Sequence, residues 1–252
     1  MLNLNMPIFE QYIRSAELNR SQVPSFNEYP FALPAVKNLT TLPFHPKVTF
    51  LVGENGSGKS TILEAIAVAY GFNAEGGTRN FNFASRPTHS QLYQYLKLVK
   101  GVKRPQDGFF LRAESFYNVA THIDELDAVS SGPPLIDAYG GRSLHEQSHG
   151  ESFFALFQHR FRGNGLYILD EPEAALSPSR QMAMLARMHQ LLNAGSQLII
   201  ATHSPIIMAY PDSWIYQIQD GIKLVKYEET EHYQVTKVFL NDTQKMLNIL
   251  LE

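Results

Sequence analysis

The amino-acid sequence predicts an α/β fold in which a mainly parallel sheet is flanked by helices. Two observations support this prediction. A short apolar strand at residues 47–52 leads through a glycine-rich loop into a helix at 60–70. Two further apolar strands, at 166–169 and 197–202, are separated by a helix at 179–192. Strands that alternate with helices form parallel sheets, and such strands are apolar throughout because both faces are covered.

The remaining elements follow from shorter patterns. Apolar residues recur at helical spacing from Ile62 to Tyr70, and Gly71 is a helix stop. Phenylalanines recur every fourth residue from Phe153 to Phe161, which is typical of a helix face packed in the core. We also expect helices at 91–99, 152–161 and 242–251, a strand at 109–113, a turn at 163–165 and a hairpin over 215–227 around Asp220-Gly221.

The composition is that of a globular protein. The chain has 252 residues, of which 44% are hydrophobic and 18% charged, which suits one domain and excludes global disorder. The net charge of −3 argues against indiscriminate nucleic-acid binding, and the lack of cysteine excludes disulfides and thiolate metal sites. Because no signal peptide and no membrane-length apolar run is present, we expect a cytoplasmic protein without membrane insertion.

The glycine-rich loop reads Gly-Glu-Asn-Gly-Ser-Gly-Lys-Ser-Thr and fits the pattern G-x-x-x-x-G-K-[S/T] at every fixed position. The glycines allow a tight turn whose N–H groups point at a phosphate. The lysine supplies a charge for the β- and γ-phosphates, and the serine hydroxyl is a ligand for Mg²⁺. The predicted nucleotide-binding residues are Gly53, Glu54, Asn55, Gly56, Ser57, Gly58, Lys59, Ser60 and Thr61.

The strand at 166–169 ends in two carboxylates. Asp170 lies at the carboxyl edge of the predicted sheet, where α/β proteins bind ligands, and would hold Mg²⁺ together with Ser60. Glu171 would act as the general base that polarises the attacking water. An apolar strand that ends in Asp-Glu is a weak signal alone, but a strong one downstream of a phosphate loop.

These motifs continue as Pro-Glu-Ala-Ala-Leu-Ser-Pro at 172–178 and as Ile-Ile-Ala-Thr-His-Ser-Pro at 199–205. In order and wording the sequence resembles the ABC-type P-loop ATPases, and most closely their soluble RecF/SMC-like branch, which includes short bacterial predicted AAA-family ATPases. The resemblance implies one ABC-type domain over 1–252, with an antiparallel β portion, a helical and signature lobe at about 86–160, and a C-terminal hairpin and helix over 205–252.

The resemblance also implies an ATP-sandwiched homodimer. The family's signature loop, usually Ser-Gly-Gly-Gln, matches Ser-His-Gly-Glu-Ser at 148–152, so that Ser148 and Gly150 would bind the γ-phosphate held by the partner. The residues at 149 and 151 depart from the pattern. His203 matches the family's switch histidine, which contacts the γ-phosphate and the water. The predicted catalytic residues are therefore Lys59, Glu171 and His203, with ATP and Mg²⁺ as cofactors.

Other residues are weaker candidates. Where the family has a glutamine near Mg²⁺, this sequence holds Glu114, whose carboxylate could also coordinate metal. Arg79 is either a phosphate contact or a surface arginine. Phe26, Tyr29 and Phe31 are candidates for stacking on adenine, although core packing is the simpler role. Lys97, Lys100, Lys103 and Arg104 would share one helical face, solvated or touching DNA. His145 and His149 have zinc-ligand spacing without a third ligand.

The chemistry is better specified than its purpose. One hypothesis is a soluble ATPase that works in DNA repair, DNA maintenance or defence, with DNA or an effector protein as a further partner. A second is the nucleotide-binding subunit of a transporter, which the altered signature loop disfavours. A third is a nucleotide-gated interaction module with little turnover, and retention of Glu171 argues against it.

Overall fold

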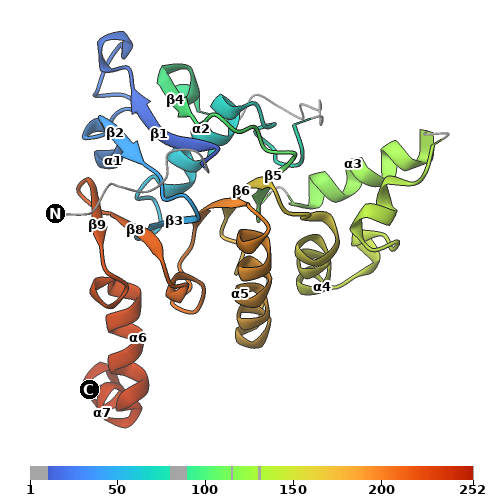
Figure 1. The fold of residues 1–252 in the computed structure, drawn as a ribbon. Helices are drawn as coiled ribbons and strands as arrows, with labels where there is room; N and C mark the ends of the chain where they lie inside the picture. Colours follow the sequence, from blue (N-terminus) through green and yellow to red (C-terminus); the bar gives the residue numbers. More distant parts are fainter. Residues whose placement is uncertain (1–10, 80–89, 115, 130–131, 252) are drawn as a thin grey trace.

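The computed structural model describes residues 11–79, 90–114, 116–129 and 132–251. Its centre is a six-stranded sheet with the order β5-β6-β7-β3-β8-β9 (Figure 1). Five strands run parallel, and β9 is antiparallel to β8. The predicted α/β fold with a mainly parallel sheet is confirmed. The strands are β5 (Asp107–Arg112), β6 (Gly165–Asp170), β7 (Gln197–Ala201), β3 (Val48–Val52), β8 (Ser213–Ile218) and β9 (Ile222–Val225).

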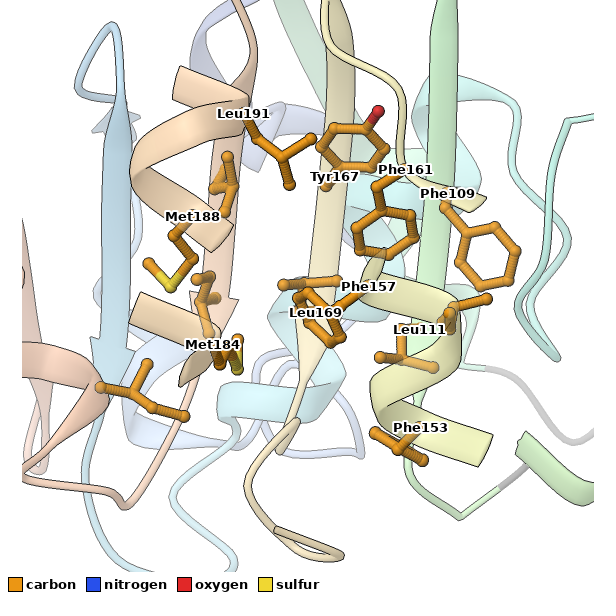
Figure 2. Packing of buried hydrophobic residues seen from close by; sticks show 14 of the residues in the cluster. Phe109, Leu111, Phe153, Phe157, Phe161, Tyr167, Leu169, Met184, Met188 and Leu191 are labelled. Carbon is orange, nitrogen blue, oxygen red and sulfur yellow. The ribbon is translucent and has the colours of Figure 1, made fainter. Parts of the chain in front are cut away.

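Successive side chains of β6 enter two different hydrophobic cores, because side chains alternate between the faces of a strand. Leu166 and Ile168 pack on the face covered by α2 (Lys59–Tyr70). Tyr167 and Leu169 pack on the opposite face, against α5 (Pro178–Asn193) and the phenylalanine stripe (Figure 2). The strand is completely buried, and its carboxyl end carries Asp170 to the edge of the sheet.

A second, three-stranded antiparallel sheet has the order β2-β1-β4. Its strands are β2 (Thr41–Pro43), β1 (Ile13–Leu18) and β4 (Leu96–Lys100). The predicted helix at 91–99 is therefore wrong: a 3₁₀ turn at Gln91–Tyr95 leads into β4. In β4, Leu96 pairs with Leu18 and Leu98 with Ala16, so a distant strand decides the structure of this short apolar stretch.

The helical lobe begins after β5. It contains α3 (Phe116–Val129) and α4 (His149–Ala155), which continues as a π turn over Leu156–Arg160. The predicted helix at 152–161 thus begins earlier, at His149. Its phenylalanine stripe is buried as expected. The residues that precede Phe116 in the expected lobe include β4 and β5, which are strands rather than helices.

The C-terminal region forms the predicted hairpin, β8-β9, and the predicted last helix, α7 (Thr243–Leu251). Between them lies α6 (Glu231–Asn241), which the sequence reading missed. The α6–α7 pair projects from the edge of the sheet (Figure 1). The short helix α1 (Pro34–Lys37) packs near the phosphate loop. Within the part of the chain that the structure describes, no helix is long and apolar enough to cross a membrane.

Candidate functional site

The phosphate loop joins β3 to α2 and is built by close backbone contacts. Gly53 has a φ of 151°, and a Cβ there would lie 2.2 Å from the carbonyl oxygen of Ile218 on β8. Gly58, the residue before α2, has a left-handed φ of 99°. Both conformations favour glycine. The sequence requirement for glycine at these positions therefore comes from the neighbouring strand and from the start of the helix.

Lys59 is buried, with 3% of the residue exposed. Its Nζ donates to the carbonyl oxygens of Gly53, at 2.9 Å, and Glu54, at 2.8 Å. Burial lowers the pKa of this ammonium group, while the nearby carboxylates of Glu171 and Asp170 oppose the shift. The phosphate loop thus holds the desolvated ammonium group of Lys59 against its own backbone carbonyls. This cation can interact with phosphate oxygens.

The two halves of the site meet at Ser60 and Asp170. The Ser60 hydroxyl donates to Asp170 Oδ1 at 3.0 Å, across 110 residues of sequence. Burial raises the pKa of Asp170 to about 7, and the hydrogen bond from Ser60 opposes this shift. A hydroxyl and a buried carboxylate are oxygen donors that suit Mg²⁺, which typically takes few protein ligands and completes its shell with water and phosphate. These two residues fit the predicted magnesium site.

Burial of Asp170 makes the stability of the unliganded protein depend on pH. The pKa is about 7 in the folded chain and 3.8 for an unperturbed aspartate. Between these values the folded state binds more protons, so the free energy of unfolding should fall as the pH rises from about 4 to about 7. Urea unfolding midpoints, measured without Mg²⁺, should show this slope, and Asp170→Asn should reduce it.

Glu173 contributes a slope of the same sign, because burial also raises its pKa. The slope of the Asp170→Asn protein should therefore be smaller than that of the wild type without vanishing. An identical slope in both proteins would contradict the assignment to Asp170.

Glu171 follows β6 in a left-handed backbone conformation, with a φ of 50°. Its N–H donates to the carbonyl oxygen of Ala201 on β7, at 2.9 Å, which holds this conformation in place. A non-glycine residue in this region carries about 1–3 kcal/mol of strain. The side chain remains 40% exposed, and its Oε1 lies 3.5 Å from His203 Nε2. The two predicted catalytic groups thus face each other.

Glu173 reinforces this arrangement, and the sequence reading gave it no role. Its Oε1 accepts a hydrogen bond from the backbone N–H of His203 at 2.6 Å. Its Oε2 is buried and has no hydrogen-bond partner within the described residues. Burial raises the pKa of this carboxyl group, and the His203 N–H opposes the shift. Glu173 therefore ties the loop after β7 to the loop after β6.

The predicted signature loop forms the N-terminus of α4. The backbone N–H and the hydroxyl of Ser148 both donate to Glu151 Oε2, at 3.0 and 2.7 Å. Glu151 is thus the reciprocal partner of a helix cap, a role that glutamate and glutamine can both fill. A Cβ at Gly150 would lie 2.6 Å from the carbonyl oxygen of Ala175. Close packing against the loop after β6 therefore requires a glycine at this position.

Two weaker candidates make none of the described hydrogen bonds of the site, although the charge of Glu114 contributes to the raised pKa of Asp170. The side chain of Glu114 is 87% exposed, and its Oε2 lies 3.4 Å from Arg112 Nη2. The described hydrogen bonds do not join Glu114 to Ser60 or Asp170, so its role at the metal stays a prediction. Arg79 is exposed, with its guanidinium 5.9 Å from the ring centre of Tyr70. Its role as a phosphate contact also stays a prediction.

The three aromatic candidates for adenine now differ. Phe31 is buried and packs edge-on against Tyr95, and the guanidinium of Arg20 covers the ring of Phe26. Tyr29 is 67% exposed, and its hydroxyl lies 3.4 Å from Thr61 Oγ1. Of these three, only Tyr29 offers an exposed ring beside the phosphate loop.

Two further clusters considered from the sequence were a basic helical face and a histidine pair with zinc-ligand spacing. Lys97 and Lys100 lie on β4, so the prediction that they share a helical face with Lys103 and Arg104 is wrong. Lys97 lies 3.7 Å from Glu17, and Lys100 lies over the ring of Tyr70. For zinc, no cluster of three or more histidine or acidic ligands occurs among the described residues. The side chain of His149 lies outside them.

One further residue of the site escaped the sequence reading. His232, on α6, lies with its Nε2 3.0 Å from His203 Nδ1. The only signal for α6 was Thr230, a residue type that caps helices and whose side chain accepts from the N–H of Tyr233. Nothing in the sequence places this helix beside the strand end that carries His203.

Two protein-family models match parts of this chain. One, described as an AAA domain, matches residues 26–119. The other, described as an AAA domain, putative AbiEii toxin, Type IV TA system, matches residues 136–209. The first covers the phosphate loop, and the second covers the carboxylate strand and His203. The family models therefore include the motifs that meet in the structure.

Curated relatives are ATP-binding proteins. The ribose import ATP-binding protein RbsA of Yersinia pestis is 25% identical over 210 residues, which is 76% of this chain and 39% of that protein. The arabinose import ATP-binding protein AraG of Mannheimia succiniciproducens is 26% identical over 230 residues, which is 81% of this chain and 43% of that protein. The chain spans about two fifths of the length of these relatives.

Among solved structures, the SMC head domain from Thermotoga maritima matches 85% of this chain and 98% of that chain, at 16% identity and a TM-score of 0.42. An inward-facing putative metal-chelate type ABC transporter matches 78% and 80%, at 16% identity and a TM-score of 0.45.

Proposed function

We propose that this chain is a P-loop ATPase domain of the ABC and SMC type that binds ATP with Mg²⁺ and hydrolyses it between two copies of itself. The Ser60–Asp170 hydrogen bond carries the proposal, because it joins the phosphate loop to the carboxylate strand at one edge of the sheet. Lys59, Glu171 and His203 surround the same edge. This is the arrangement that phosphoryl transfer to water requires.

In the proposed reaction, the N–H groups of the loop and Lys59 hold the phosphates. Ser60 and Asp170 would hold Mg²⁺, which would supply positive charge to the phosphate oxygens. Glu171 takes a proton from a water molecule whose oxygen bonds to the γ-phosphorus, while the bond to the bridging oxygen breaks and ADP leaves. His203 faces the same space and donates from Nε2 to a γ-phosphate oxygen.

A second copy is needed to complete the site. Helices α4 and α6 lie on opposite sides of α5 (Figure 1), and α6 lies beside the phosphate loop. No described hydrogen bond joins Ser148 or Gly150 to the phosphate loop of their own chain. In the proposed dimer each signature loop reaches the ATP of the other copy. The test is the ATPase rate per subunit against protein concentration: a rate that climbs and saturates supports shared sites, and zero activity throughout would refute turnover by the chain alone.

Ser148→Arg should prevent ATP-driven association while leaving ATP binding by the single chain intact. In the proposed dimer, the γ-phosphate of the ATP held by the partner approaches the exposed N-terminal end of α4. The arginine places a long side chain at this end. Sedimentation with and without Mg·ATP would measure the effect. Ser148→Ala is the control, because it removes the hydroxyl that donates to Glu151 but adds no bulk. Unimpaired association of the arginine variant would show that α4 lies outside the interface.

Two biological roles remain in competition. The first is defence, DNA repair or DNA maintenance, with DNA or an effector protein as partner; the family description that matches residues 136–209 names a putative toxin system, which supports only the defence part. The alternative, a transporter's nucleotide-binding subunit, is favoured by the import proteins among the relatives. Affinity purification from membranes and from the soluble fraction separates them: stable recovery of an integral membrane protein would support the transporter role and oppose the first.

A further inference from the structure

The switch histidine has a partner from a different element. His203 Nδ1 lies 3.0 Å from His232 Nε2, and the ring centres are 5.2 Å apart. His203 follows β7, whereas His232 lies in the first turn of α6. The two rings therefore meet only because α6 docks beside the carboxyl ends of the parallel strands.

The start of α6 is firmly held. Thr230, the residue before the helix, is fully buried, and its hydroxyl donates to the carbonyl oxygen of Tyr227 at 2.7 Å. The Tyr227 hydroxyl in turn donates to the carbonyl oxygen of Pro205 at 2.8 Å, in the loop that follows His203. These bonds fix the position of His232 relative to His203, so their contact is part of the fold.

We propose that His232 is a positioning residue that fixes the tautomer and the ring orientation of His203. The inference rests on the proposed ATPase function, in which His203 Nε2 donates to a γ-phosphate oxygen. It extends that function by assigning α6 a part in the chemistry.

The proposal follows from assigning a donor or an acceptor role to each ring nitrogen of His203. His203 Nε2 is buried, lies 3.5 Å from Glu171 Oε1, and has no hydrogen-bond partner within the described residues. To donate to a carboxylate or a phosphate, Nε2 must carry the hydrogen. A neutral imidazole has one N–H, so Nδ1 must then be the acceptor. His232 Nε2–H is the donor within reach.

The surrounding charges favour a neutral pair. Burial lowers the pKa of His203, and the charge of Lys59 lowers it further, while Glu171 acts in the opposite direction. Burial also lowers the pKa of His232, against the raising effect of Glu231. Two neutral rings joined by one hydrogen bond satisfy both nitrogens without a buried charge.

His232 also lines a cavity of about 520 Å³ that opens beside the phosphate loop. The cavity is walled by the loop on one side, by His203, and by the first turns of α6, with lining residues Glu54, Asn55, His203, Glu231, His232, Val235 and Thr236. His232 thus lies at the boundary between the reaction space and α6. Displacing α6 would remove the donor and leave the tautomer of His203 undefined.

The test compares His232→Gln with His232→Leu in the full chain. The glutamine amide keeps an N–H donor near Nδ1 of His203, and leucine removes it. Nitrogen-15 NMR of the histidine rings, without nucleotide, should show His203 protonated at Nε2 in the wild type and the glutamine variant. The leucine variant should show a mixture of tautomers. The ATPase kcat should fall about tenfold in the leucine variant and recover in the glutamine variant, with KM little changed.

The matched control is His189→Leu, at a histidine on α5 whose Nδ1 contacts the Tyr210 hydroxyl instead. Its kcat and the His203 tautomer should equal those of the wild type. Protonation of His203 at Nδ1 in the wild type would overturn the proposal, as would a leucine variant with an unchanged tautomer. If the wild-type chain fails to hydrolyse ATP, the proposed function fails, but the NMR result still decides the role of His232.

Discussion

Replacing Lys59 with alanine is expected to abolish ATP binding, with an affinity loss of at least about a hundredfold. The ammonium group is already desolvated, and two carbonyl oxygens of the loop hold it. When a phosphate replaces these carbonyl acceptors, the ammonium group forms a charge-assisted hydrogen bond with it. This costs little further desolvation, because the ammonium group is already buried. Isothermal titration with Mg·ATP measures the loss directly.

The matched control is Lys47→Ala. Lys47 immediately precedes β3, at the end of the strand opposite the phosphate loop. Its exposed Nζ pairs with Asp212 at 2.7 Å. Its removal should leave the affinity for ATP unchanged. Circular dichroism of both variants checks folding, because loss of Lys59 leaves buried carboxylates without their nearby cation. An affinity near the wild-type value in a folded Lys59→Ala protein would refute the phosphate-loop assignment.

Glu171→Gln is expected to lower the rate of ATP hydrolysis by about 10²–10⁴-fold while ATP binding persists. Glutamine keeps the shape of the side chain and can adopt the same left-handed backbone, but its amide cannot accept the proton of the attacking water. Because hydrolysis would no longer separate the two copies, Mg·ATP should trap a dimer. Single-turnover phosphate release gives the rate, and light scattering during size-exclusion chromatography gives the mass.

Two further variants serve as comparisons for the Glu171→Gln result. Glu228→Gln changes an exposed carboxylate in a 3₁₀ turn and should leave both readouts unchanged. Glu173→Gln tests the neighbouring carboxyl group, which binds the backbone of His203. Normal hydrolysis by the Glu171 variant together with a slow Glu173 variant would transfer the base role to Glu173.

The main sheet was predictable because its strands and the helices between them form local patterns. The strand at 166–169 and the helix at 179–192 both appear close to their predicted limits. The antiparallel sheet was not predictable in this way. Its strands β1 and β4 are short and far apart in sequence, and the pairing of Leu96 with Leu18 overrides local preference.

The same distinction applies to the site. Lys59, Ser60, Asp170 and Glu171 could be predicted as site residues because the phosphate loop and the strand end are compact motifs, and the structure brings these side chains together. The contact of His203 with His232 depends on tertiary packing alone. The predicted signature loop departs from the family pattern at Glu151, and only the structure shows that Glu151 accepts two hydrogen bonds from Ser148.

The position of His232 has a consequence for the order in which a newly made chain matures. Synthesis proceeds from the N-terminus, and the phosphate loop, the carboxylate strand and His203 all emerge before α6. The phosphate loop completes its packing when Ile218 of β8 comes to lie against Gly53. Only afterwards does α6 dock and bring His232 to His203. A growing chain should therefore complete the proposed ATP site before the ring of His203 is held by His232, so that the proposed nucleotide binding would become possible before the proposed hydrolysis.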